Sequence, residues 1–239
     1  MSVKISVLGS SGRMGQLALK LIEQSSDLEL HSALTSKNSL SESQGADLLL
    51  DLTKPEASTA IVDYAIQNNL RLLVGTSGWT KEKLEAVEKQ IVGSLATVTI
   101  IPNFSIGSVL ATKFVAEAGK YFDQIEITET HHPKKLDAPS GTALFTSQAI
   151  SASRQGRPAS PVTENNQAPL FNGIPITSLR IEGAHAEQEV SLAATNESLY
   201  VKHVVTSHEV YSQGILLAIR KTMQLTGLTV GLLPLLEGK

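Results

Sequence analysis

The first hundred residues alternate short apolar runs with stretches whose apolar residues recur at helical spacing. Met14, Leu17, Leu21 and Ile22 have the 3.6-residue period of a helix, and Pro55 is suited to begin the next one. Strands that alternate with helices in this way form βαβ units, in which the strands are parallel. The sequence therefore predicts an α/β fold with a doubly wound parallel sheet over residues 1–103. Its strands are expected at residues 3–8, 28–34, 48–52, 70–74 and 98–101.

A glycine-rich loop lies where the first predicted strand passes into the first helix. Glycines at its first, fourth and seventh positions let the backbone turn tightly, approach a pyrophosphate closely and pack the new helix onto the sheet. The amides at that helix N-terminus then face the phosphates. A tight βα turn would also use glycine, but the position in the first βα unit favours a Rossmann dinucleotide-binding domain. The loop reads Gly9, Ser10, Ser11, Gly12, Arg13, Met14 and Gly15.

The end of the second predicted strand bears on the choice of cofactor. A site that prefers NAD usually has a carboxylate there for the ribose hydroxyls, whereas this chain has Thr35, Ser36 and Lys37. These residues suit a 2′-phosphate at least as well as a free ribose, so NADPH and NADH both remain open. Arg13 is either a second cation for that phosphate or a solvent-facing helix residue. The loops after the fourth and fifth strands are expected to border the nicotinamide, unless they are ordinary turns; they carry Gly75, Thr76 and Ser77, and Pro102, Asn103 and Phe104.

The pattern changes after residue 103 and predicts a second α+β domain, residues 104–209, built on a mainly antiparallel sheet. A helix is expected with Ile106, Val109, Leu110 and Phe114 on its apolar face, and residues 154–172, with three prolines, are expected to form an exposed loop. Alternating segments at 177–181, 189–194 and 199–205 predict strands, the last two joined as a hairpin at residues 195–198. A closing helix at 210–225 is expected to return, with the rest of 210–239, to the first domain, since a parallel sheet needs helices on both faces.

Residues 131–142 carry two histidines and two lysines between the strand pattern of Ile125 and Ile127 and a further helical pattern. A polar run between buried elements is a loop of the kind where binding and catalysis concentrate. Its cations would attract an anionic substrate, and a histidine can transfer protons near neutral pH. A solvated connecting loop is the alternative, but two prolines and Gly141 give this loop a defined shape. The pattern favours a functional site.

Composition excludes several classes of function. Hydrophobic residues make up 41% of the 239 residues, charged residues 18%, and the formal net charge is −3, which argues against nucleic acid as a partner. Cysteine is absent, so disulfides, thiolate catalysis and cysteine-ligated zinc are excluded. No apolar run approaches the roughly 20 residues of a membrane helix, and no signal peptide precedes the first strand pattern. We therefore expect a cytoplasmic protein with no membrane partner.

Five motifs resemble those of the 4-hydroxy-tetrahydrodipicolinate reductase (dihydrodipicolinate reductase) family, in order over nearly the whole chain. They are GSSGRMG at 9–15, DLTKPE at 51–56, VGTSG at 74–78, PNFSIG at 102–107 and ETHHPKKLDAPSGTA at 129–143. The resemblance implies NAD(P)H-dependent reduction of 4-hydroxy-tetrahydrodipicolinate to tetrahydrodipicolinate in diaminopimelate and lysine biosynthesis. It also implies that the second domain binds the cyclic dicarboxylate substrate and builds a homotetramer.

The resemblance also implies roles for single residues. His131 matches the family's proton donor and acceptor, Lys135 its proton donor and His132 a substrate contact. Residues at the start of the following helix match the group that holds a substrate carboxylate, namely Ser140, Gly141 and Thr142. This chain departs from the family at Thr35, where an acid is common, at His208, where an arginine commonly stands, and in a shorter 154–172 loop.

Three other hypotheses stay open at this point. Another two-domain NAD(P)-dependent reductase, such as an aspartate or sugar dehydrogenase, would not need two histidines followed by a lysine. A non-catalytic NADPH-sensing protein would bind the nucleotide but tolerate the loss of Lys135. A metal site at His131 and His132 is disfavoured because no carboxylate ligand is placed beside them, so we expect no metal.

Overall fold

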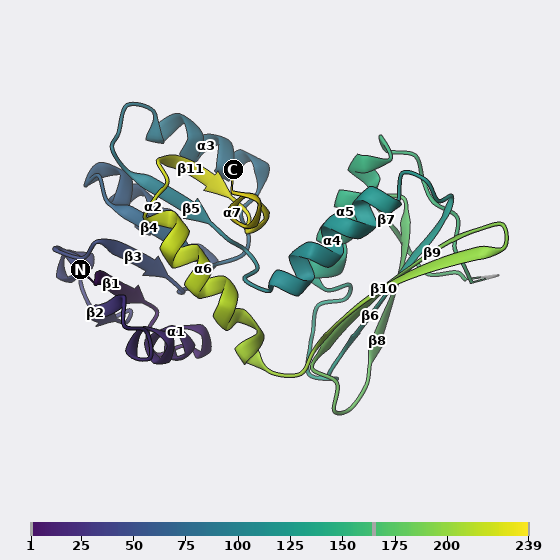
Figure 1. Cartoon of the computed structure of the whole chain (residues 1–239), viewed down its shortest axis with the longest axis horizontal. Helices are drawn as coiled ribbons and strands as arrows, with labels where there is room; N and C mark the ends of the chain where they lie inside the picture. The colour runs from purple at the N-terminus through teal and green to yellow at the C-terminus, as the bar shows by residue number, and fades with distance from the viewer. Residues whose placement is uncertain (1, 164–165, 239) are drawn as a thin grey trace. The chain divides into compact units, whose positions relative to one another are not determined.

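The structure is a computed structural model that describes residues 2–163 and 166–238. The chain forms two compact units (Figure 1). The first comprises residues up to Ile106 together with those from Tyr211 onward, and the second is Gly107–Val210. Among the described residues, no helix combines the length and the apolar character needed to cross a lipid bilayer.

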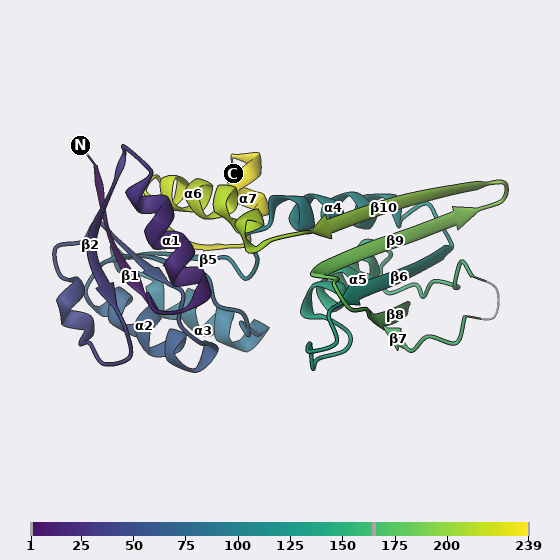
Figure 2. The ribbon, with the colours of Figure 1, turned by 90° about the horizontal axis from the view of Figure 1, so that it is seen from below.

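The first unit is built on a six-stranded sheet in the order β11-β5-β4-β3-β1-β2, with every pair of neighbouring strands parallel. The predicted doubly wound sheet is confirmed. Helices α2 and α3 cover one face and α1 and α6 the other (Figure 2). The elements are β1 (Val3–Leu8), α1 (Arg13–Glu23), β2 (Leu28–Leu34), the 3₁₀ helix η1 (Leu40–Ser43), β3 (Leu48–Asp51), α2 (Pro55–Gln67), β4 (Arg71–Val74), α3 (Lys81–Ile91), β5 (Thr97–Ile100), α6 (Ser212–Thr222), β11 (Gly227–Val230) and α7 (Leu233–Glu237).

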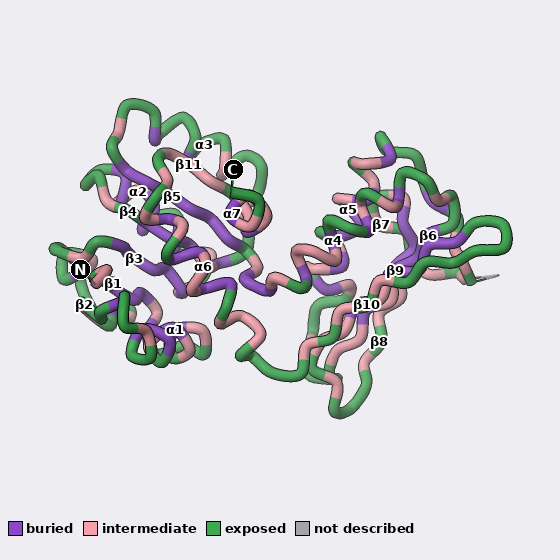
Figure 3. Tube along the Cα trace, in the orientation of Figure 1, coloured by how far each residue is buried: buried purple, intermediate pink, exposed green. Residues whose placement is uncertain are grey.

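The central strands of this sheet are buried on both faces, as expected when crossover helices cover a parallel sheet (Figure 3). Leu48, Leu49 and Leu50 of β3 are completely inaccessible to solvent. This burial explains why β3 reads as a continuous apolar run, without the alternation of a half-exposed strand. Pro55 is the first residue of α2 and Thr80 caps α3 through its side chain, so both predicted helix starts are confirmed.

The closing helix lies in the first unit, but it is shorter than predicted and a strand follows it. Helix α6 packs against α1, β4 and β5, but it covers only Ser212–Thr222. A 3₁₀ helix, η2 (His208–Tyr211), precedes it. The chain then adds β11 at the sheet edge beside β5, a strand that the sequence analysis missed. With four residues, GLTV, this edge strand is too short for a clear period-two pattern.

The second unit contains a five-stranded sheet in the order β10-β9-β6-β8-β7. Of the strand pairs in the described part of this unit, β6 and β8 are parallel and the others are antiparallel, so the predicted mainly antiparallel sheet is confirmed. Strands β9 and β10 form the expected hairpin, with Asn196 at positive φ in its turn, although β8 and β9 each begin three residues earlier than predicted. The elements are α4 (Ile106–Ala118), β6 (Gln124–His131), α5 (Gly141–Ser153), β7 (Leu170–Phe171), β8 (Ile174–Arg180), β9 (Ala186–Ala194) and β10 (Glu197–Val205).

The predicted apolar face of α4 is wrong. Phe114 is exposed, and the buried positions are Ser108, Thr112 and Val115. The hydroxyl groups of Thr112 and Thr146 lie 3.0 Å apart at the contact of α4 with α5. A polar contact between threonines therefore lies on the buried side of α4, where the apolar spacing did not indicate it.

The exposed loop predicted at 154–172 is wrong near both ends, since Leu170–Phe171 form strand β7 and the first residue is buried. Arg154 is buried, and its guanidinium donates to the carbonyls of Gly119, Phe122, Arg157 and Pro158. One cation thus satisfies four backbone acceptors, which is why an arginine can lie inside this unit. Residues 164 and 165 of the same loop lie outside the described residues.

We predict that Ile219→Ala lowers the free energy of unfolding of the first unit by about 2–5 kcal/mol, the usual cost of such a cavity. Ile219 lies on the buried face of α6 and is fully inaccessible. Leu95→Ala is the matched control, since Leu95 is 86% exposed, and should change stability by less than about 0.5 kcal/mol. Urea denaturation followed by circular dichroism measures both, and equal effects would contradict the packing of α6 on the sheet.

Candidate functional site

The glycine loop is shaped by backbone contacts that only glycine permits. Gly9 has φ +80°, and a Cβ atom there would lie 2.6 Å from the Leu52 carbonyl oxygen. A Cβ at Gly15 would lie 2.3 Å from the Gly9 carbonyl oxygen. Gly12 caps α1 and provides no side-chain acceptor for the first-turn amides. Those amides can therefore bind a phosphate, and the loop fits a dinucleotide.

The end of β2 lies beside this loop, because the amides of Gly9 and Ser10 both donate to the Leu34 carbonyl. The buried Ser10 hydroxyl donates to the same carbonyl, so its side chain ties the loop to β2. Thr35 uses its amide and its hydroxyl to bind Asn38 Oδ1, at 3.0 and 2.9 Å. Of the three predicted residues after β2, Thr35 is half-buried, and Ser36 and Lys37 are exposed to solvent.

The loops that follow β4 and β5 are at the same edge of the sheet as the glycine loop, since all six strands are parallel. Phe104 is buried, and a Cβ at Gly75 would lie 2.6 Å from its ring. The Phe104 ring packs against Gly75, and the expected place of Phe104 beside the cofactor stays a prediction. A Cβ at Gly214 of α6 would lie only 1.9 Å from the Phe104 carbonyl oxygen, so Gly214 lets α6 approach this loop.

A buried carboxylate that the sequence analysis did not assign supports the same edge. Asp51, at the end of β3, accepts hydrogen bonds from the hydroxyl groups of Thr53 and Ser58. The Ser58 hydroxyl lies 2.7 Å from the Thr76 hydroxyl, which also accepts from the Trp79 indole N–H at 3.3 Å. This chain of contacts fixes the 75–78 loop to the sheet.

In the second unit, the predicted catalytic segment lies between β6 and α5. His131 is the last residue of β6, so it is held in the sheet and does not lie on the loop as expected. Gly141 is the first residue of α5, and the Ser140 hydroxyl accepts from the Ala143 amide at 3.2 Å as the helix cap. A Cβ at Gly141 would meet open space, and its φ is not positive, so the chain itself imposes no need for glycine there.

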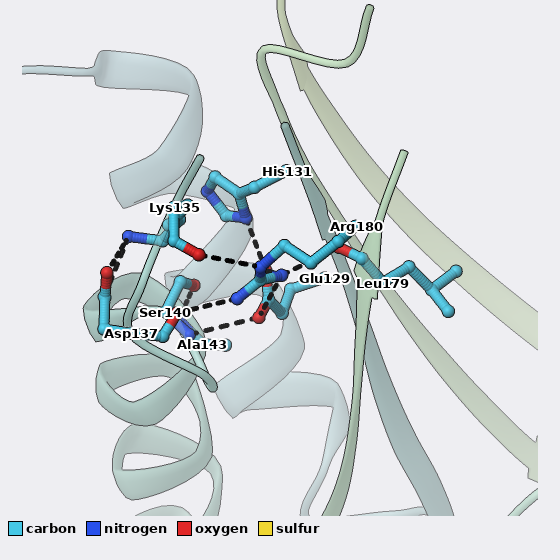
Figure 4. Close-up of polar contacts among 8 residues, drawn as sticks. All are labelled: Glu129, His131, Lys135, Asp137, Ser140, Ala143, Leu179 and Arg180. Atoms are coloured by element: carbon cyan, nitrogen blue, oxygen red, sulfur yellow. Dashed lines mark hydrogen bonds and ion pairs between the residues drawn. The ribbon is translucent and has the colours of Figure 1, made fainter. Parts of the chain in front are cut away.

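The predicted proton donor is held by a neighbouring carboxylate on the loop. Lys135 Nζ lies 2.8 Å from both carboxylate oxygens of Asp137 (Figure 4). This hydrogen bond and charge lower the pKa of the Asp137 carboxyl below its usual value. His132 and Lys134 are exposed. In the described residues, no three side chains of the metal-ligating types form a cluster that could hold a metal ion.

Two charged residues that the sequence analysis missed lie at the centre of this segment. Glu129 on β6 has no solvent-accessible surface, and Arg180 on β8 donates to both of its carboxylate oxygens, at 3.1 and 3.2 Å. His131 Nδ1 also contacts the Glu129 carboxylate (Figure 4). Glu129 follows Ile125 and Ile127 at alternate positions of β6, on the side of the strand that faces the core. A carboxylate at a buried position needs hydrogen-bond partners, so this pattern could have identified Glu129 as a site residue from the sequence.

The surroundings of Glu129 and His131 lower the pKa of both side chains. Burial alone would raise the pKa of the Glu129 carboxyl, but hydrogen bonds from Ser178, His131 and Arg180 outweigh it and lower that pKa. Burial lowers the pKa of the His131 imidazole, and the Lys135 and Arg180 cations act in the same direction against the opposing effect of Glu129. At neutral pH the site therefore holds an ionised Glu129 and a neutral His131.

Comparisons with known proteins agree over the whole chain. Residues 3–104 match the family model described as dihydrodipicolinate reductase, N-terminus, and residues 107–235 match the one described as dihydrodipicolinate reductase, C-terminus. The 4-hydroxy-tetrahydrodipicolinate reductase of Clavibacter michiganensis is 42% identical over 236 residues, covering 97% of this chain and 85% of the relative. The Streptomyces coelicolor protein of the same name is 39% identical over 241 residues and covers 96% of both chains.

Comparison with solved structures leads to the same family. The dipicolinate-bound dihydrodipicolinate reductase from Paenisporosarcina sp. TG-14 has a TM-score of 0.81 at 29% identity, covering 97% of this chain and 98% of its own. A myo-inositol dehydrogenase from Corynebacterium glutamicum is 12% identical with a TM-score of 0.61, covering 95% of this chain and 90% of its own, which shows a shared fold alone. The two family models and the identities above 30% are decisive: this chain belongs to the dihydrodipicolinate reductase family.

Proposed function

We propose that the chain catalyses the NAD(P)H-dependent reduction of 4-hydroxy-tetrahydrodipicolinate to tetrahydrodipicolinate in diaminopimelate and lysine biosynthesis. The observation that carries the proposal is the arrangement of His131 at the end of β6, Lys135 on the following loop and Gly141 at the start of α5. These groups offer a proton acceptor, an ammonium group and free helix amides within one segment of a chain that belongs to this family. The other two-domain reductases are not favoured, because their similarity is limited to the fold.

The residues divide into those that bind the cofactor and those that bind the substrate. The amides of residues 13–15 would hold the pyrophosphate, and Arg13 and Lys37 would face the adenosine ribose. Thr76, Ser77 and Asn103 would border the nicotinamide, which supplies a hydride when bound. His132 and the start of α5, at Ser140, Gly141 and Thr142, would bind the substrate dicarboxylate, with the ring close to Gly141, where a Cβ atom would meet no part of the chain.

The reaction needs one hydride and one proton, and the hydroxyl group of the substrate leaves as water. Negative charge develops on the conjugated ring nitrogen system as the ring is reduced, and a cation nearby stabilises it. Lys135 is the proton donor, because its side chain ends in an N–H donor that Asp137 holds in place. His131 is neutral at pH 7 and can accept or return a proton on its Nε2 atom.

NADPH oxidation tests the proposed function directly. Dihydrodipicolinate synthase would generate the unstable substrate in the same reaction, and absorbance at the nicotinamide band would follow its reduction. We expect turnover that depends on both the synthase and the chain. A chain that binds NADPH without oxidising it under these conditions is a sensor and contradicts the proposal.

We predict that Lys135→Ala lowers kcat by about 10²- to 10⁴-fold, the usual contribution of a placed proton donor. The Kd for NADPH should stay unchanged, because the glycine loop belongs to the other unit. Lys134→Ala is the matched control, since it removes the same charge from the adjacent, exposed position and should leave kcat near wild type. Unchanged turnover in Lys135→Ala, or an equal loss of NADPH binding, is inconsistent with the assigned role.

The cofactor preference follows from the charges at the end of β2. Thr35 replaces a carboxylate, and Lys37 is exposed there, so we expect NADPH to be accepted at least as well as NADH. Lys37→Ala should raise KM for NADPH by about tenfold and leave NADH unchanged, as for the loss of one charged hydrogen bond. Lys4→Ala, at the opposite end of β1, is the control. A wild-type kcat/KM for NADH at least ten times that for NADPH rejects this preference.

We further propose a cytoplasmic homotetramer that assembles through the open face of the second sheet. Leu179, Ile181, Tyr200 and Val204 are between 39% and 60% exposed, on the face of the sheet opposite α5. A sheet with apolar residues on both faces needs a partner surface. Light scattering should give a multiple of 25.5 kDa, about four times that mass for a tetramer.

A double variant with Tyr200→Glu and Val204→Glu should dissociate the assembly. Each chain would then bury two carboxylates without partners in the subunit interface. Leu95→Glu introduces the same charge at an 86% exposed position of the first unit and serves as the control. A wild-type mass equal to one chain excludes the assembly.

A further inference from the structure

Glu129 is enclosed by hydrogen-bond donors from three parts of the second unit. Its side chain has no accessible surface. His131 Nδ1 reaches it from the same strand, Arg180 Nη1 from β8 at 3.1 and 3.2 Å, and the Ser140 amide from the start of α5 at 3.3 Å. An ionised carboxylate only accepts hydrogen bonds, so each of these groups must donate to it.

The contact with Glu129 fixes the tautomer of His131. Nδ1 must carry a proton in order to donate to the carboxylate, whether the ring is neutral or charged. The exchangeable position is therefore Nε2, on the edge of the ring turned away from Glu129 (Figure 4). Since the side chain of His131 is 15% exposed, the rest of the ring is enclosed and cannot turn freely.

Arg180 connects the same carboxylate to the loop that carries Lys135. Its Nη2 atom donates to the Asp137 carbonyl at 2.6 Å, and its Nε atom donates to the Lys135 carbonyl at 3.3 Å. Its Nη1 atom also donates to the Leu179 carbonyl at 2.7 Å. The guanidinium thus holds the backbone on both sides of Leu136 and is itself held by Glu129 (Figure 4).

We propose that Glu129 and Arg180 are positioning residues: the Glu129 carboxylate orients His131 with Nε2 as its proton-exchanging atom, and Arg180 fixes the loop that presents Lys135. This inference rests on the proposed reductase function and names the two residues on which its proton-transfer groups depend. Neither residue needs to touch the substrate for this role.

The charges around His131 determine how its titration responds to a change at Glu129. The groups that face it are Glu129 on β6, Arg180 on β8, and Lys135 and Asp137 on the loop. Glu129 is the group in contact with the ring and stabilises the imidazolium form. Its neutralisation leaves the two cations dominant, so the pKa of His131 must fall further.

Glu129→Gln tests the first half of the proposal, because it keeps the side-chain shape and removes the charge. We expect kcat to fall about 10²-fold, as for the loss of an oriented acid–base group, with the Kd for NADPH unchanged. The limb of the kcat/KM pH profile set by His131, identified by its absence in His131→Gln, should move to lower pH by about one unit. Glu129→Asp keeps the charge and should leave that limb near its wild-type position.

Glu126→Gln is the matched control. Glu126 is a buried glutamate on the same strand, but it lies on the other face of the sheet and accepts from Thr163 and Asn166. The same substitution there should leave kcat and the pH profile unchanged. An equal loss in both variants means that removing any buried carboxylate from β6 reduces activity, and it overturns the proposal.

A double-mutant cycle separates positioning from general stability. In the His131→Gln background, Glu129→Gln should cost less than about threefold, because its partner is already lost. A full 10²-fold loss in that background, or wild-type kcat and pH profile in Glu129→Gln, overturns the proposal.

Arg180→Lys keeps the charge beside Glu129 but cannot make both backbone contacts, and it remains informative if Glu129→Gln does not fold. We expect kcat to fall at least tenfold, as for loss of a positioned catalytic group. The limb of the pH profile set by His131 should not move. A kcat equal to that of the wild type contradicts the role of Arg180.

A wild-type chain that fails to oxidise NADPH with substrate present rejects the proposed function itself. That outcome is distinct from every result of the variants above.

Discussion

A carboxylate without access to water must be surrounded by donors, and in the second unit this requirement organises the whole candidate site. Glu129 lies at an inward position of β6, where Ile125 and Ile127 are its apolar neighbours on the same face. The donors that satisfy it come from the end of β6, from β8 and from the start of α5. The elements that carry the acid–base groups and the helix amides therefore meet at one negative charge.

The fold of the first unit could be predicted from sequence because its signals are local. Apart from β11, the strands of the parallel sheet were indicated by their apolar residues. Pro55 and Thr80 mark helix starts, Pro55 by its fixed backbone and Thr80 by its capping side chain. The glycine loop was predictable because the spacing of its glycines in the first βα unit is itself a local pattern, and Gly15 is required by the carbonyl of Gly9 within the same loop. The residue-by-residue assignment of the cofactor and substrate contacts remains a prediction.

What the sequence could not reveal depends on contacts between distant segments. Arg154 satisfies carbonyls more than thirty residues away, and Arg180 reaches Glu129 across 51 positions. Gly214 carries no local signal, because the reason for it is the carbonyl of Phe104. The buried face of α4 also depends on a distant contact. Thr112 on that face meets Thr146 of α5, whereas the spacing of Ile106, Val109 and Phe114 indicated another face.

The contacts of Asp51 have an optical consequence. The hydrogen-bonded series from its carboxylate through Ser58 and Thr76 ends at the indole of Trp79. Trp79 is the single tryptophan of the chain, and it is only partly buried beside the 75–78 loop. Its fluorescence therefore originates at the edge of the sheet where the nicotinamide is expected. The chain carries its own probe for events at that loop, without any introduced label, and the second unit contributes no tryptophan signal to obscure it.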